Sequence, residues 1–170
     1  MKVLLRAPLL TNSGYGVHSR QIFEWLEQKA NIDLRVECLR WGHCPWIVSP
    51  DALDGLAGRI MSKAMPFEKH VTVDLSIQNQ LPNEWDPSIA KRNIGVSAFV
   101  ETDRCNAQWV EACNRMDHVI VPSTFTKTVV ESSGQLKTPL SVVPEWYNHA
   151  LLNKSEIDKI ISSDSRFNFN

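Results

Sequence analysis

Two glycines flank a tyrosine, and a histidine follows, in the stretch TNSGYGVHSRQIFEWLEQ at residues 11–28. A glycine-rich turn that opens a helix presents unpaired N–H groups at the positive end of the helix dipole, which suits a phosphate or diphosphate. We therefore interpret Gly14, Tyr15 and Gly16 as candidate diphosphate-binding residues. His18 comes next as a candidate substrate-binding side chain, and it fits a hydrogen-bonded core histidine equally well.

The same stretch has two other interpretations. One is a plain turn that starts a helix, in which the glycines serve only the chain geometry. The other is the dinucleotide fingerprint GxGxxG, with Ser19 at its third position and Glu37 as the acidic residue about 20 residues further on. In that fingerprint the first glycine directly follows a strand, whereas here the loop Pro8–Ser13 intervenes, so the fingerprint is disfavoured.

Polar residues also follow the apolar run Asn93–Val100. In α/β sheets ligands bind at the carboxyl ends of the strands, so a carboxylate there could orient an acceptor hydroxyl or act as its base. This makes Glu101 the catalytic candidate and Thr102 and Asp103 substrate-binding candidates; the alternative is a solvated loop in which Asp103 caps a helix. Ser123 fits a helix N-cap first and an acceptor contact second.

Tryptophans supply a further set of candidates. Trp41, Trp46 and Trp85 lie in predicted loops, where an indole either stacks on a sugar or packs as a lid.

Composition excludes several functional classes. The net charge is −1, which offers no basic face for nucleic acid. No apolar stretch approaches the roughly 20 residues of a membrane-spanning helix. The four cysteines lack CxxC pairing, which predicts reduced structural thiols in a cytoplasmic protein and no metal. A chance metal site at His43 and Cys44 is the alternative.

Strands and helices that alternate along the chain would position these side chains. Apolar or alternating runs predict strands at Lys2–Ala7, Ile32–Leu39, Val71–Ile77, Asn93–Val100, His118–Val121 and Leu140–Val143. Helices are predicted after the glycines (apolar stripe His18, Ile22, Trp25, Leu26), at Asp51–Ala64, at Ala107–Arg115, from the Ser123 cap to a C-cap at Gly134, and at Ser155–Ile161. The alternation predicts a doubly wound, mostly parallel, Rossmann-like α/β sheet.

The motifs resemble those of one enzyme family. SGYGVHSRQIFEWL resembles the opening of GT-B fold glycosyltransferases of the retaining family 4 type, and residues 93–134 resemble that family's central block with its D-x-V-I-V-P-S-x-F run. LSVVPEWYNHALLN resembles the run V-x-V-I-P-x-G-V-D that leads into the second domain. The chain departs from the pattern where Glu101-Thr102 replaces a histidine of many relatives and where Glu145-Trp146-Tyr147 replaces the usual glycine.

The resemblance implies the N-terminal half of a GT-B fold, with residues 1–165 as the acceptor-side domain and 166–170 as the start of a missing second domain. It also implies a nucleotide-sugar-dependent glycosyltransferase with a UDP- or GDP-sugar donor, no further cofactor, and a glycan, lipid or small-molecule acceptor. The family's glutamate pair, seven residues apart, has no counterpart here, so we expect the isolated chain to be inactive. The alternative is a non-catalytic nucleotide- or sugar-binding Rossmann-like domain. On the enzyme interpretation, Gly16→Val should weaken donor use far more than folding.

Overall fold

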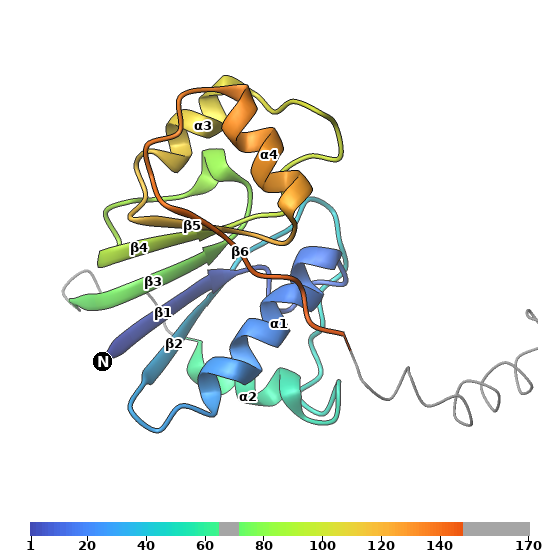
Figure 1. Cartoon of the computed structure of the whole chain (residues 1–170). Coiled ribbons are helices and arrows are strands. Elements are labelled where there is room, and N and C mark those ends of the chain that lie inside the picture. Colours follow the sequence, from blue (N-terminus) through green and yellow to red (C-terminus); the bar gives the residue numbers. More distant parts are fainter. Residues whose placement is uncertain (65–71, 148–170) are drawn as a thin grey trace, which may run out of the picture.

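The computed structural model describes residues 1–64 and 72–147. Its strands form one six-stranded, all-parallel sheet in the order β2-β1-β3-β4-β5-β6 (Figure 1). The strands are β1 (Lys2–Ala7), β2 (Asp33–Cys38), β3 (Val73–Asn79), β4 (Ala90–Val96), β5 (His118–Val121) and β6 (Leu140–Val142). The predicted Rossmann-like α/β fold class is confirmed.

Helices cover both faces of this sheet. They are α1 (Gly14–Glu27), α2 (Leu56–Lys63), the short 3₁₀ helix η1 (Pro82–Glu84), α3 (Ala107–Cys113) and α4 (Thr124–Ser133). In Figure 1, α1 and α2 lie on one face, and α3 and α4 lie on the other. The strand order reverses between β1 and β3, which is where ligands bind in sheets of this kind.

Two separate hydrophobic cores fill the spaces between sheet and helices. The first joins β1 and β2 to α1 and α2 and comprises Val3, Leu5, Ala7, Leu9, Leu10, Phe23, Leu26, Leu34, Val36, Leu56, Ala57 and Ile60. The second joins β5 to η1, α3 and α4 and comprises Trp85, Phe99, Val110, Cys113, Met116, Val119, Val121 and Val130. Each core therefore stabilises one half of the sheet from one side.

Helix α1 turns a different face to the core than its apolar stripe predicts. Trp25 is exposed and lies under the Lys29 ammonium, 4.5 Å from the ring centroid. Arg20 is buried instead, because its Nη1 donates to the carbonyl oxygens of Leu9 (2.8 Å) and Thr11 (3.0 Å). A buried arginine that pairs with backbone carbonyls is invisible to a pattern built on apolar residues alone.

Several element boundaries also differ from prediction. Strand β4 ends at Val96 rather than at Val100, because the chain leaves the sheet at Ser97 and Phe99 takes a left-handed conformation (φ 59). Helix α2 begins at Leu56 rather than at Asp51, because the preceding turn contains three residues with positive φ: Leu53, Asp54 and Gly55. The predicted helix Ser155–Ile161 and the tail 166–170 lie outside the described residues.

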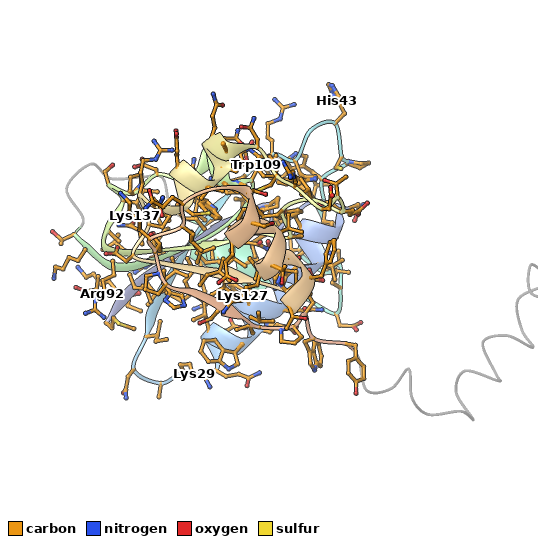
Figure 2. The ribbon with its side chains drawn as sticks, turned by 45° about the horizontal axis from the view of Figure 1, so that its top comes forward. Lys29, His43, Arg92, Trp109, Lys127 and Lys137 are labelled. Carbon is orange, nitrogen blue, oxygen red and sulfur yellow. The ribbon has the colours of Figure 1, made fainter. Side chains whose placement is uncertain are left out.

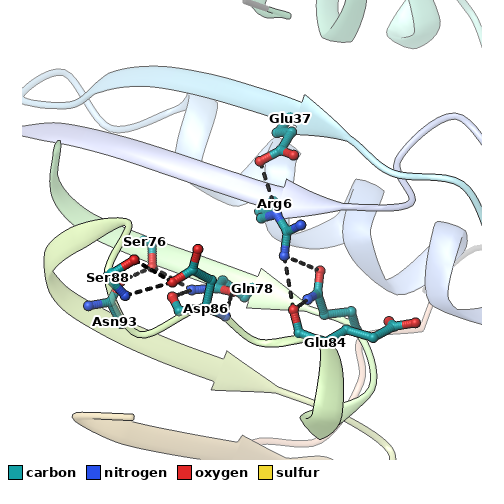
Figure 3. Close-up of polar contacts among 9 residues, drawn as sticks. Arg6, Glu37, Ser76, Gln78, Glu84, Asp86, Ser88 and Asn93 are labelled. Atoms are coloured by element: carbon teal, nitrogen blue, oxygen red, sulfur yellow. Dashed lines mark hydrogen bonds and ion pairs between the residues drawn. The ribbon is translucent and has the colours of Figure 1, made fainter. Parts of the chain in front are cut away.

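The connection between β3 and β4 contains the short 3₁₀ helix η1 and a polar network rather than an α-helix (Figure 3). The buried Gln78 amide donates to the Asp86 carbonyl oxygen (2.7 Å) and accepts from the Asp86 N–H (2.9 Å). Trp85 donates its indole N–H to the Gln78 carbonyl oxygen (3.0 Å). Its ring lies over Gly95, where a built Cβ would come within 2.7 Å of the indole. The connection thus covers the sheet by side-chain hydrogen bonds and one large ring.

Candidate functional site

The first turn of α1 lies beside the switch point of the sheet, on the side to which the strand arrowheads point (Figure 1). Ser13 caps the helix, since its Oγ accepts the Gly16 N–H (2.9 Å) and its carbonyl oxygen accepts the Val17 N–H (2.9 Å). Among the described residues, the N–H groups of Gly14 and Tyr15 have no acceptor. A Cβ at Gly14 would meet nothing within 4 Å, so a ligand has room to approach there.

Gly16 has a different role from Gly14. A Cβ built on it would lie 2.3 Å from the Thr11 carbonyl oxygen and 2.9 Å from the Thr11 hydroxyl oxygen, distances that no side chain can adopt. The fold itself requires glycine at this position. The expectation that Gly16→Val weakens donor use far more than folding is therefore wrong. Any side chain at this position disrupts the packing of α1 on the loop before it, so the substitution should impair folding itself.

The Tyr15 side chain joins α1 to the loop that follows β4. Its ring stacks on Trp41 with centroids 4.1 Å apart. Its hydroxyl lies 2.8 Å from the Ser97 Oγ and accepts the Ala98 N–H (3.1 Å). Burial raises the pKa of the phenol, the nearby Glu145 charge raises it further, and the hydrogen bond to Ser97 partly offsets both effects. The uncharged Tyr15 side chain thus connects the first turn of α1 with the loop after β4.

Beneath this turn lies a buried polar cluster that the sequence analysis missed. Asn79, the last residue of β3, donates from Nδ2 to the Ser19 Oγ (2.9 Å), and Ser19 donates to the Tyr15 carbonyl oxygen (2.6 Å). The Asn79 Oδ1 is buried without a partner in the described structure. The signal available in the sequence was the polar run that ends the apolar strand β3.

The catalytic and acceptor candidates lie in the loop between β4 and α3. Glu101, Thr102 and Asp103 are all exposed, and Glu101 forms no hydrogen bond or ion pair with residues 1–64 or 72–147. Thr102 donates to the Arg104 carbonyl oxygen (2.8 Å). The cap of α3 is Asn106, not Asp103, since Asn106 accepts the Gln108 N–H (2.9 Å).

The His18 side chain contacts the segment that follows β6. Its Nδ1 lies 3.4 Å from the Glu145 Oε1, and Gln21 donates to the Trp146 carbonyl oxygen (2.8 Å). Burial lowers the pKa of the imidazole, and the Glu145 charge opposes that effect. The residues that replace the glycine of the family pattern therefore contact α1 directly.

Ser123 caps α4, as its primary interpretation predicts. Its Oγ accepts the Thr126 N–H (3.1 Å) and lies 2.9 Å from the Thr126 Oγ1. No hydrogen bond within the described residues links Ser123 to Tyr15 or to Glu101. The structure brings Gly14, Tyr15 and the loop after β4 together and leaves Ser123 at the neighbouring helix.

The loop tryptophans divide between packing and exposure. Trp85 is a core residue, which agrees with the packing interpretation and not with sugar stacking. Trp46 is exposed and forms a β-bridge with Thr11. His43 lies at the outer tip of the same loop and points away from the fold (Figure 2).

Glu37, the acidic residue of the dinucleotide fingerprint, is an ion-pair partner within the sheet. Its Oε2 lies 3.0 Å from Nε of Arg6, whose Nη1 also donates to Gln80 (3.3 Å) and to the Glu84 carbonyl oxygen (3.1 Å), as Figure 3 shows. This pairing gives Glu37 a structural function that needs no ribose.

The described part of the chain contains no cluster of three or more histidine, cysteine or acidic side chains that would hold a metal ion. All four cysteines are free thiols. Burial raises the pKa of Cys38 to about 11 and that of Cys113 to about 12. Among residues 1–64 and 72–147, no helix has the length and apolar character to cross a bilayer.

The chain matches no protein-family model, and comparisons with curated proteins and with solved structures find no significant similarity.

Proposed function

We propose that this chain is the N-terminal, acceptor-side half of a nucleotide-sugar-dependent glycosyltransferase of the GT-B type. The observation that carries the proposal is the pair of acceptor-less N–H groups of Gly14 and Tyr15 at the switch point of the sheet. Tyr15 ties them to the loop that presents Glu101, through its contact with Ser97. The motif resemblance supports the same assignment.

In the proposed reaction the bond between the anomeric carbon and the diphosphate breaks, and a new bond forms to an acceptor oxygen. The two N–H groups and the α1 dipole would stabilise the departing diphosphate. Glu101 would orient the acceptor hydroxyl and receive its proton. A second domain would hold the nucleotide and the sugar, as the resemblance implies.

One observation favours the alternative of a non-catalytic nucleotide- or sugar-binding domain. Glu101 lies exposed in a loop and has no partner among the described residues that would fix its orientation. A general base is usually held in place by neighbouring groups. The two functions share the binding site at Gly14 and differ in whether Glu101 matters.

Binding is tested by adding UDP, GDP, UDP-glucose or GDP-mannose to the 170-residue chain and monitoring the backbone amide signals by NMR. We expect the Gly14 and Tyr15 amides to shift most. Gly14→Ala and Gly14→Val should weaken binding progressively, by about tenfold or more for valine, because the added carbons occupy the ligand's space and meet no protein atom. Unchanged affinity in Gly14→Val, or shifts confined to other regions, would contradict the proposal.

Catalysis is tested in a preparation that transfers sugar. Glu101→Gln should lower turnover by a factor of about 10²–10⁴ with saturating substrates, as expected for a positioned base. The control is Glu131→Gln, which removes another exposed carboxylate, one that pairs with Lys127 on α4. Turnover within a few-fold of the parent in both variants would show that Glu101 is not the base, and the non-catalytic alternative predicts no sugar transfer at all.

A further inference from the structure

We propose that Glu145 is a positioning residue for His18, holding the imidazole proton on Nδ1 so that Nε2 accepts a hydrogen bond from a ligand hydroxyl. The tautomer rests on the geometry alone. The ligand contact rests also on the proposed function, since it places His18 in the same binding site as Gly14 and Tyr15.

The geometry comes from two distant parts of the chain. His18 lies on the second turn of α1, just beyond the acceptor-less N–H groups of Gly14 and Tyr15. Glu145 follows β6, and its Oε1 lies 3.4 Å from the His18 Nδ1. The hydrogen bond from Gln21 to the Trp146 carbonyl oxygen (2.8 Å) holds the backbone next to Glu145 against α1.

A carboxylate beside one ring nitrogen fixes where a neutral imidazole keeps its proton. Neutral histidine has one N–H donor and one acceptor nitrogen, and the neighbour of one nitrogen decides which is which. Glu145 accepts only, so the proton of His18 belongs on Nδ1. Within the described residues the Nε2 has no hydrogen-bond partner, which leaves its lone pair available.

The charges around His18 select the ligand group. Burial disfavours the charged imidazolium, so His18 presents a lone pair rather than a cation, while Glu145 adds negative charge. Tyr15 also responds to the Glu145 charge, and it is a neutral phenol whose pKa is raised by burial. This environment repels a phosphate and favours a hydroxyl donor, such as a hydroxyl of a sugar or ribose. The diphosphate would bind to the N–H groups of Gly14 and Tyr15, and the hydroxyl would donate to the Nε2 of His18.

The test reads the imidazole nitrogens of the uniformly ¹⁵N-labelled chain by long-range ¹H–¹⁵N correlation, with His18→Gln to assign the signal. Above the titration of His18 we expect a protonated-type Nδ1 and an unprotonated-type Nε2. Glu145→Ala should shift the tautomer toward Nε2–H and lower the titration midpoint. Glu131→Gln, which removes a carboxylate that pairs with Lys127 on α4, should keep the parental tautomer.

A parental His18 protonated at Nε2, or a tautomer that Glu145→Ala leaves unchanged, would overturn the positioning role. The ligand contact is tested by adding UDP-glucose, GDP-mannose or inorganic pyrophosphate to the parent. We expect both nucleotide sugars to shift the Nε2 resonance and pyrophosphate to shift only the Gly14 and Tyr15 amides. A pyrophosphate effect at Nε2 would overturn the hydroxyl assignment. Absence of any ligand effect would contradict the proposed function and leave the tautomer result standing.

Discussion

The hydroxyl of Tyr15 and the Oγ of Ser97 lie 2.8 Å apart and connect the first turn of α1 with the loop after β4. The same Ser97 Oγ accepts the Phe99 N–H (3.2 Å), at the residue where the chain takes its left-handed turn. A bulky residue with positive φ persists only where its surroundings hold it. Tyr15 therefore helps to fix the loop conformation that determines where Glu101 lies.

Tyr15→Phe should destabilise the chain by about 1 kcal/mol, the usual net value of one hydrogen bond. The ring and its stack on Trp41 remain, so the loss comes from the hydroxyl contacts with Ser97 and Ala98. Urea denaturation measures the stability, and amide hydrogen exchange at Ala98 and Phe99 should accelerate. The double variant with Ser97→Ala serves as the control: the two losses should be less than additive, and strict additivity would show that the hydroxyls do not interact.

The two glycines of the α1 turn should respond oppositely to substitution by alanine. Gly16→Ala should cost about 1–3 kcal/mol or more, because the new Cβ overlaps the Thr11 carbonyl oxygen. Gly14→Ala should be neutral or slightly stabilising, because its Cβ meets no atom and alanine favours the helix. Thermal melting of both variants decides this, and equal melting temperatures would contradict the packing role of Gly16.

Stability should fall on the alkaline side because of two buried thiols. An unfolded cysteine loses its proton near pH 9, whereas Cys38 and Cys113 keep theirs in the folded chain up to pKa values of about 11 and about 12. Between these values the folded state binds more protons than the unfolded state, so the free energy of unfolding decreases as pH rises. The slope is at most about 1.4 kcal/mol per pH unit for each thiol.

Urea denaturation between pH 8 and pH 11 under reducing conditions measures this slope. Cys38→Ala and Cys113→Ala should each flatten the slope above pH 9, because both folded pKa values lie at or above the upper end of this range. Slopes identical to that of the parent in both variants would show that the thiols do not control alkaline stability.

Gln78→Leu should destabilise the fold by about 1–3 kcal/mol, because it removes both hydrogen bonds between the buried Gln78 amide and the backbone of Asp86. The exposed Gln28 at the end of α1 provides a matched control, since Gln28→Leu removes the same amide where water can replace it. Comparable denaturation midpoints for the two variants would mean that the network of Figure 3 contributes little to stability.

The strand periodicity predicted the fold class because buried parallel strands need continuous or alternating apolar runs, as in β1 and β5. The end of β4 could not be predicted, since Ser97, Ala98 and Phe99 read as a continuation of the strand. What ends it is the contact of Ser97 with Tyr15, a partner remote in sequence. The same holds for Trp25, whose exposure depends on how Arg20 is paired.

For the candidate site, the sequence predicted the elements better than the partners. Glycine spacing located the turn at Gly14, but it could not separate a glycine that leaves space for a ligand from Gly16, which packs against Thr11. The sequence also could not show that Glu145 contacts His18, because that contact depends on the path of the chain after β6. Such distances follow from tertiary structure alone.

The two cores lie on opposite faces of the sheet and on opposite halves of it, so that β3 and β4 share the boundary. Each half carries its own apolar burial and its own helices, which is the condition for sub-global opening in separate cooperative units. Native-state hydrogen exchange should then sort the slowest amides into two groups with different opening free energies, one in β1 and β2 and one in β5. The Tyr15–Ser97 contact crosses this boundary, so a ligand held between α1 and the loop after β4 would raise the cost of opening either unit alone.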